Sequence, residues 1–233
     1  MNTNQLLAQL SYGEFNNLAL SNEGDGTIRT RDMGKMLTFI NDGLHDLYTK
    51  FLVKESVVTV QLYEYITNYL LVPRFAQSNQ VQTDVSEAYI LDNLRDKFKG
   101  DVGKIYAVFN DLGVELPIND ETKMNSVFIR GKESITVPSP DPERVLFIHY
   151  QTTHPRITMQ NLDEELDIHD TMIAALRSYV AHKLFLSIGS ADAIHKAQEY
   201  QGQYIFQTQS LVAVDASGDS RFHFKQFKRG GWV

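Results

Sequence analysis

Proline is confined to the middle of this 233-residue chain, and its distribution limits where long helices can form. All six prolines lie between Pro73 and Pro155. Proline lacks a backbone N–H and clashes with the preceding helical turn, so an interior proline ends or kinks a helix. We therefore expect long helices at the two ends of the chain and turn-rich structure in the middle.

Apolar side chains with helical spacing predict a long helix over residues 30–53. They recur every three or four residues and form one stripe: Met33, Leu37, Ile40, Leu44, Leu47 and Phe51. Gly34 and Gly43 lie within this helix, and each costs about 1 kcal/mol relative to alanine. The stripe is still clear, so a helix is expected.

A second helical pattern fills the last third of the chain. Helices are expected over 164–188 and 190–212, joined by a short turn in which Gly189 caps the first helix. The apolar face of the first helix comprises Leu166, Ile173, Leu176, Val180 and Leu184. That of the second comprises Ile194, Ala197, Gln201, Tyr204, Thr208 and Leu211. Because the connection is short, the two helices should pack as an antiparallel hairpin.

The middle of the chain has the composition of strands and turns. Runs rich in β-branched and aromatic residues predict strands over 56–62, 104–109, 126–130, 134–137 and 144–150. Turn-forming residues separate several of these runs, which indicates a small antiparallel sheet or sandwich. Residues 85–99 are compatible with a short helix.

These patterns predict an α+β protein with a helical core built from both ends of the chain. The core is expected to comprise residues 1–53 and 160–213, because these helices need each other to cover their apolar stripes. An antiparallel β-rich segment over 54–159 is inserted between them. An extended C-terminal tail is expected over 214–233.

The end of the chain differs in charge from the rest. Residues 221–233 contain four basic side chains and no acidic one, whereas the rest of the chain has 18 basic and 29 acidic side chains. Four large aromatic residues accompany them, namely Phe222, Phe224, Phe227 and Trp232. Leaving each in water forgoes roughly 2 kcal/mol of burial, so this segment is expected to dock on a surface. Residues 215–220 have the composition of a flexible linker.

Three interpretations of this docking are compatible with the sequence. In the first, the segment packs on the rest of its own chain; in the second, it reaches a neighbouring subunit or a partner with an acidic groove. A third interpretation is single-stranded nucleic acid, which interleaved aromatic and basic side chains suit. The acidic excess in the rest of the chain argues against nucleic acid. A subunit or protein partner is therefore favoured.

The sequence offers little support for catalysis. The absence of cysteine excludes disulfides, cysteine-bound zinc, iron–sulfur clusters and a thiol nucleophile. P-loop, dinucleotide-binding and nucleophile-elbow motifs are absent as well. His149 and His154 would need a distant carboxylate to form a metal site, so two surface histidines at a strand end are the favoured interpretation. We expect no catalytic, metal or cofactor site.

An acidic run falls where the helix over 164–188 is expected to begin: Asp163, Glu164, Glu165, Asp167 and Asp170. Carboxylates at a helix N-terminus interact favourably with the helix dipole, which explains the run without calcium or catalysis. The N-terminus has the features of neither a signal peptide nor a membrane span. We expect a soluble protein made in a reducing compartment, the host cytoplasm if the resemblance described next holds.

Several segments, in the same order along the chain, resemble the head–tail adaptor, or connector, proteins of tailed bacteriophages. Residues 36–51 (MLTFINDGLHDLYTKF) resemble the first long helix of that family, which a strand follows directly. The other matching segments are 108–120 (VFNDLGVELPIND) for the β-insertion, 145–150 and 153–157 for the strand leaving it, 174–184 (AALRSYVAHKL) for the second core helix, and the aromatic and basic end at 227–233.

The resemblance implies a structural virion protein at the head–tail junction, without enzymatic activity. Such adaptors form a ring, commonly of twelve copies, beneath the portal protein. The ring extends the DNA channel without sequence-specific binding and presents a surface to a tail (nozzle or tube) protein. In similar proteins the C-terminal segment reaches the portal. For this chain, the resemblance implies that the portal is contacted by Arg221, Phe222, Phe224, Phe227, Lys228, Arg229 and Trp232.

Two other functions stay open. A tail-completion or tail-tube protein that contacts the adaptor would also lack enzymatic motifs. A small hydrolase or nuclease would instead use His149, His154 and an acidic partner. The acidic body favours the adaptor, because an acidic channel wall repels DNA phosphates and reduces sticking.

Overall fold

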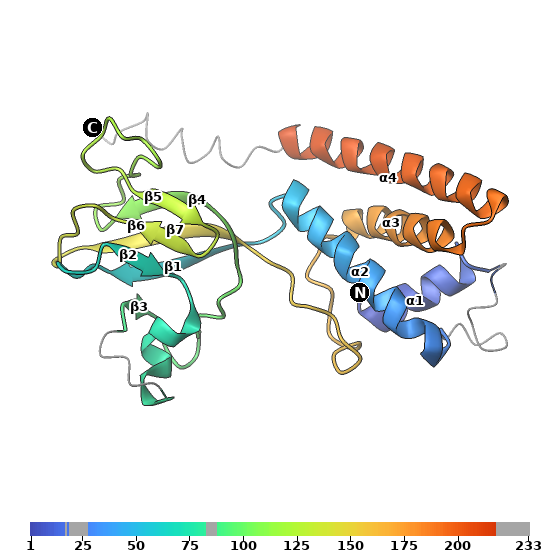
Figure 1. Cartoon of the computed structure of the whole chain (residues 1–233), viewed down its shortest axis with the longest axis horizontal. Helices are drawn as coiled ribbons and strands as arrows, with labels where there is room; N and C mark the ends of the chain where they lie inside the picture. The colour runs from blue at the N-terminus through green and yellow to red at the C-terminus, as the bar shows by residue number, and fades with distance from the viewer. Residues whose placement is uncertain (17, 19–27, 83–87, 218–233) are drawn as a thin grey trace. The chain divides into compact units, whose positions relative to one another are not determined.

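The computed structural model describes residues 1–16, 18, 28–82 and 88–217. It confirms the predicted α+β class, with N-terminal helices, central antiparallel sheets and two packed C-terminal helices (Figure 1). The chain divides into two compact units. The helical unit comprises Met1–Phe51 and Arg156–Val233, and the β-rich unit comprises Leu52–Pro155.

The helical unit contains α1 (Thr3–Tyr12), α2 (Thr30–Lys50), α3 (Asp170–Ile188) and α4 (Ala191–Ser217). Its core is formed by leucines of α1 together with the apolar stripe of α2, in which Ile40, Leu44 and Leu47 are fully buried. From α3 come Leu176 and Val180, which are also fully buried. No helix among the described residues combines the length and apolar content needed to cross a membrane.

Helix α2 packs closely on α3 at Gly43. A Cβ atom on Gly43 would lie 2.7 Å from Leu176 Cδ1 and 2.9 Å from Tyr179 Cδ1, closer than such atoms approach in proteins. The glycine that weakens α2 as an isolated helix is therefore what allows it to approach α3. Gly34 differs, since no atom of another element in the described part of the chain lies within 4 Å of a Cβ built there.

Asn41 ties the returning chain to α2 by two hydrogen bonds. Its Oδ1 accepts from the backbone N–H of Ile157 at 2.8 Å, and its Nδ2 donates to the carbonyl of the same residue at 2.9 Å. The side chain thus pairs with the backbone as a neighbouring strand would. Ile157 itself is buried.

Helix α1 was not predicted from the apolar pattern. Asn2 caps it by accepting from the backbone N–H of Gln5 at 2.9 Å, while the Gln5 side chain accepts from the N–H of Asn2 at 3.0 Å. This reciprocal capping box satisfies two backbone donors that the first turn leaves unpaired. The spacing of Asn2 and Gln5 is the sequence signal for this helix.

The hairpin of α3 and α4 is confirmed, but α3 begins at Asp170 and not at residue 164. The segment before it is bound to the start of the chain, because Leu166 N–H donates to the Met1 carbonyl and Asn4 N–H to that of Leu162. Only Asp170 of the acidic run lies in the first turn, so the dipole explanation is wrong for the other four carboxylates. Gly189 ends α3 in the left-handed conformation (φ 76°), as predicted.

The β-rich unit contains two antiparallel sheets. The first has the strand order β3 (Ile90–Leu91), β1 (Glu55–Gln61), β7 (Val145–Thr152) and β4 (Val102–Asn110). The second has the order β2 (Asn68–Leu70), β6 (Ser134–Thr136) and β5 (Phe128–Gly131). Both sheets contribute to one core that includes Val60, Tyr69, Ile135 and Ile148. Short 3-10 helices at Pro73–Phe75 and Gln77–Gln82 complete the unit.

Each predicted strand is present, with ends shifted by a few residues. The prediction of a short helix over 85–99 is wrong. Residues 83–87 lie outside the described residues, and Ile90–Leu91 forms β3. After it, Asn93 Oδ1 accepts from the backbone N–H groups of Arg95 and Asp96, and Asp92 Oδ2 from that of Phe98. Side chains that bond to nearby backbone in this way offer it an alternative to a helix.

We predict that Gly43→Ala destabilises the protein by about 1–2 kcal/mol. Overpacking against Leu176 and Tyr179 costs about 1–3 kcal/mol, which the better helix propensity of alanine offsets in part. Gly34→Ala is the matched control in the same helix and should stabilise by about 0.5–1 kcal/mol. Urea unfolding of both variants measures this, and equal effects would contradict the proposed close approach.

Candidate functional site

The predicted portal-contact residues follow α4 directly in the chain. All seven, Arg221, Phe222, Phe224, Phe227, Lys228, Arg229 and Trp232, lie outside the described residues, so their role stays a prediction. The linker expected over 215–220 is wrong for its first half, because α4 continues to Ser217. The apolar residues Leu211–Val214 extend the helical pattern without a break, which the compositional argument for a linker overlooked.

Helix α4 is therefore the element from which the C-terminal segment emerges. It packs through a narrow stripe in which Ala193, Ala197, Tyr204 and Thr208 are buried. The face predicted from the sequence is wrong at Ile194 and Gln201, which are exposed. Imidazole Nδ1 of His182 on α3 lies 2.9 Å from the Ala197 carbonyl and adds a polar contact between the two helices.

A polar cluster centred on Tyr204 fixes α4 against α2. The Tyr204 hydroxyl donates to the Asp46 carboxylate and accepts from Lys50 Nζ at 3.3 Å. Lys50 also pairs with Asp46 at 2.8 Å and lies 4.7 Å from the centroid of the Tyr204 ring. The Tyr179 ring meets that of Tyr204 edge to face at 5.3 Å.

Burial and nearby carboxylates favour the protonated form of the two tyrosines in this cluster. Burial raises the pKa of Tyr204, and the adjacent Asp46 carboxylate raises it further. Burial also raises the pKa of Tyr179, in the same sense as the neighbouring carboxylates of Asp42 and Asp46. Both phenols are therefore protonated at neutral pH, and the Tyr204 hydroxyl, in the middle of α4, donates to Asp46 of α2.

The two histidines considered for catalysis contact different groups. His149 on β7 lies between two aromatic side chains of β4, with ring centroids 6.2 Å from Tyr106 and 4.8 Å from Phe109. Imidazole Nδ1 of His154 lies 2.5 Å from the carbonyl oxygen of the next residue, Pro155. Among the described residues, no group of three or more His, Asp or Glu side chains is placed to hold a metal ion.

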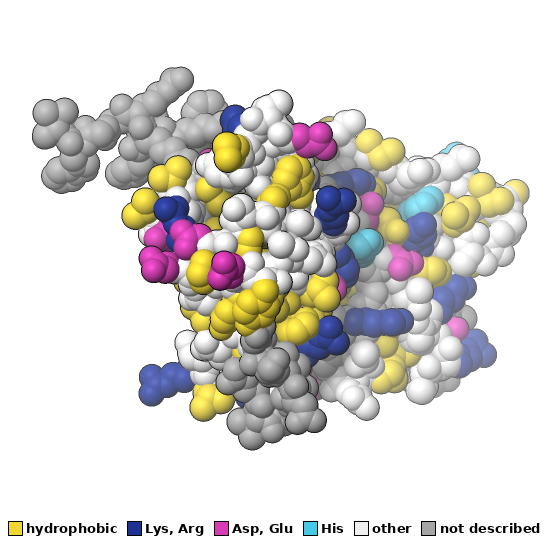
Figure 2. Space-filling view, turned by 60° about the vertical axis from the view of Figure 1, so that its left-hand side comes forward, with side chains coloured by type: hydrophobic (Ala, Val, Ile, Leu, Met, Phe, Trp, Pro, Cys, Tyr) yellow, Lys and Arg dark blue, Asp and Glu magenta, His cyan; other side chains and the backbone are white. Residues whose placement is uncertain are grey.

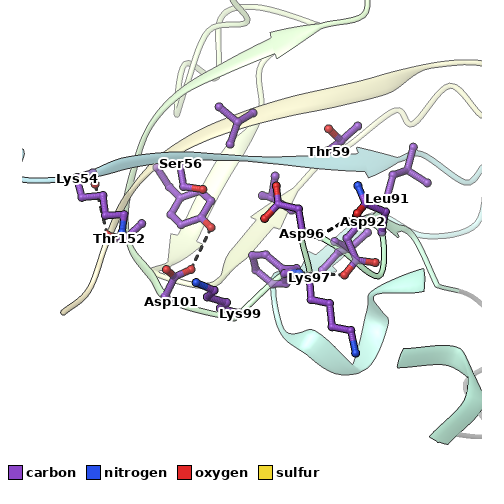
Figure 3. A pocket seen from close by; sticks show the side chains of 16 residues that line it. Lys54, Ser56, Thr59, Leu91, Asp92, Asp96, Lys97, Lys99, Asp101 and Thr152 are labelled. Atoms are coloured by element: carbon purple, nitrogen blue, oxygen red, sulfur yellow. Dashed lines mark hydrogen bonds between the residues drawn. The ribbon is translucent and has the colours of Figure 1, made fainter. Parts of the chain in front are cut away.

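A polar pocket of about 330 Å³ lies beside β1 and β3 of the β-rich unit (Figure 3). Uncharged residues of both strands line it, together with three lysines and three aspartates. The charged residues are Lys54, Lys97, Lys99, Asp92, Asp96 and Asp101. The formal charges of these six side chains balance. Sequence reasoning missed the pocket because β pairing brings together segments almost 100 residues apart.

Two of the pocket aspartates have structural hydrogen bonds. Asp92 accepts from Ser78 Oγ at 2.6 Å and from the backbone N–H groups of Ser78 and Phe98. Burial alone would raise the pKa of Asp92, but these bonds outweigh it and lower the pKa. Asp101 accepts from the Tyr150 hydroxyl at 3.1 Å, and burial raises the pKa of Tyr150 to about 12. Asp101 thus ties the end of the loop over 92–101 to β7, whereas Asp92 ties its start to Ser78 of the second 3-10 helix and to Phe98 within the loop.

Charges of both signs occur together on the face shown in Figure 2. Acidic and basic side chains are interspersed with apolar ones there, without one continuous patch of a single sign. This arrangement differs from the lysine- and arginine-rich surface that binds DNA phosphates. The apolar residues exposed on the β-rich unit include Tyr65, Leu94, Leu112 and Met124.

We predict that Tyr204→Phe destabilises the protein by about 1–2 kcal/mol, because it removes a hydrogen bond to a charged group while retaining the ring. Tyr200→Phe on the same helix is the control. It keeps the ring that stacks on Phe185 at 5.6 Å and should change stability little. Chemical denaturation of both variants measures this, and a Tyr204→Phe variant as stable as wild type would refute a structural role for the cluster.

We predict that His149 makes the protein less stable in mild acid. Burial lowers the pKa of His149 below 6.5, and the Glu55 carboxylate opposes this only in part. The unfolded chain then binds the proton first, so stability is complete above pH 6.5 and falls as the pH drops through 6.5 towards the folded-state pKa. His149→Phe should lose less stability than wild type between pH 7.5 and 5.5. Unfolding curves measured across this range test it, and parallel losses would contradict it.

A scan against protein-family models and a search of curated proteins each found no match to this chain.

Proposed function

We propose that this protein is a structural virion protein, a head–tail adaptor. In this role it forms an oligomeric ring beneath the portal, extends the DNA channel and joins the capsid to the tail. The resemblance of its sequence segments to that family is the starting point. The portal, a tail protein and further copies of the chain are its proposed partners.

One observation carries the proposal, namely the way in which the two units are built from the chain. The helical unit takes both ends of the chain, and the β-rich unit is inserted between Phe51 and Arg156. The resembling segments fall in corresponding elements, since 36–51 covers most of α2 and 174–184 lies in α3. Residues 145–150 lie in β7, the strand that leaves the insertion.

The two-unit organisation suits a protein that joins two others. Each unit has its own apolar core. Each can therefore present a binding surface whose structure does not depend on the folding of the other unit. A junction protein needs such separate surfaces for a partner above and a partner below. The net charge of −7 further supports a conduit, because a DNA-binding wall would slow the passage of DNA.

The C-terminal segment is the proposed portal anchor. Helix α4 is fixed to α2 through Tyr204 and Asp46, so the helix that leads into the segment is held on a packed core. Tryptophan and arginine dominate protein interfaces when they are fully desolvated. The segment contains Trp232 and Arg229, with Phe224 and Phe227 close by in the sequence.

Mixing the protein with purified portal rings tests this function. We predict that the full-length chain adds a ring in negative-stain images and co-sediments with the portal. A variant ending at Asp219 should not, and Trp232→Ala should weaken binding by about thirtyfold or more, the loss of a hot-spot residue.

A variant with the residues 221–233 in scrambled order is the matched control, since it keeps composition and charge. Binding of the scrambled variant at the wild-type level would show that charge alone suffices and would refute the anchor roles of the named residues. Binding of neither full-length nor truncated protein would refute the portal assignment. Binding of both would keep the adaptor function and move the anchor into the body.

A further inference from the structure

Helix α4 has an exposed face that carries no charged side chain. Its members follow one another at helical spacings of three or four residues along one side: Ile194, Gln198, Gln201, Gly202, Ile205, Gln209 and Val212. We call this set the neutral face. The apolar side chains in it are well exposed, with 40% of Ile194, 46% of Ile205 and 54% of Val212 accessible to solvent.

The neutral face is separate from the stripe that packs α4 within its own unit. That stripe consists of Ala193, Ala197, Tyr204 and Thr208, all buried. At 100° per residue, the neutral face is centred roughly a quarter-turn around the helix from it. Helix α4 thus has two adjacent stripes suited to packing, and only the first is covered among the described residues.

The lack of charge is unusual for an exposed helix surface. From Tyr200 to Val214 the chain has no Asp, Glu, Lys or Arg. The exposed residues of α2 make a contrast, because they include Arg31, Lys35 and Asp42. Surface helices ordinarily carry such charged residues on the side facing water.

Gly202 gives an independent reason to place a partner on this face. A glycine in a helix interior is disfavoured relative to alanine. At Gly43 the packing of α3 explains the glycine, but among the described residues no atom of another element lies within 4 Å of a Cβ built at Gly202. A missing side chain on an open helix face allows the backbone of another element to approach closely.

Charge selects a second copy of the same chain as the partner. Copies with a net charge of −7 repel one another, and they approach at lowest cost through surfaces without charge. A strongly basic or acidic partner would gain nothing from the neutral face. We infer that the neutral face of α4 contacts a second copy of this chain, with Gly202 at the point of closest approach.

The size of the face indicates how strong this contact is. Residues 194–212 span about 27 Å, and a helix is about 10 Å wide, so the face covers about 270 Å². A stable interface buries about 800 Å² on each partner. The neutral face is therefore one part of a larger contact, and association of the purified chain depends on concentration.

Sedimentation velocity of the full chain over a range of concentrations tests the inference. Wild-type mass should rise with concentration. Ile205→Arg places a charge on the neutral face and should lower the association constant at least tenfold. Gln203→Arg is the matched control, because Gln203 is also exposed but lies on the opposite side of α4, and it should associate as wild type does.

Gly202→Ala separates this contact from an effect on folding. Alanine should raise the thermal midpoint, since it favours the helix, and should lower association, since its methyl group blocks close approach. Wild-type protein that stays monomeric at every concentration would overturn the inference, as would normal association of Ile205→Arg or Gly202→Ala. No portal is present in this experiment, so a failure of portal binding and a failure of self-contact are distinguishable.

Discussion

The packing of α2 against α3 at Gly43 is the contact on which the helical unit depends. Gly43 and Leu176 are more than 130 residues apart in the chain, yet a methyl group on the first would lie within 2.7 Å of the second. Asp46 and Lys50 lie about one and two turns further along α2, where both contact Tyr204 of α4. Through this contact the N-terminal stripe of α2 is covered by a helix from the C-terminal part of the chain.

A second contact of α2 explains how the chain accommodates a β-rich insertion between its helical segments. Asn41 pairs with the backbone of Ile157, so the chain that returns from the insertion is fixed to the helix it left. The entropy lost on closing a loop grows only slowly with its length, so an insertion of this size adds little to that cost. An insertion with its own core, which includes Tyr69 and Ile148, stabilises itself.

Helix α4 connects the structural argument to the proposed function. Its buried stripe fixes it to α2 and α3, its neutral face is the proposed contact with another copy, and its C-terminal end leads towards the aromatic and basic segment in the sequence. The same helix thus has one packed contact and two proposed ones, on different sides and at its end. This division suits a protein proposed to act as a ring between two larger assemblies, in which each copy meets its neighbours and a partner at once.

The sequence alone determined the class of fold, because the signals for it are local. The apolar spacing of α2, the glycine that ends α3 and the β-branched runs of the strands each depend on neighbouring residues. The start of α3 was decided by tertiary structure, since the Leu166 N–H donates to the Met1 carbonyl and the Asn4 N–H to that of Leu162, which holds residues 162–166 outside the helix. Periodicity likewise placed Ile194 and Gln201 in the buried face of α4, although both are exposed. An apolar stripe shows that a side chain suits burial, but only the three-dimensional arrangement decides which element covers it and which stripe stays open for a partner.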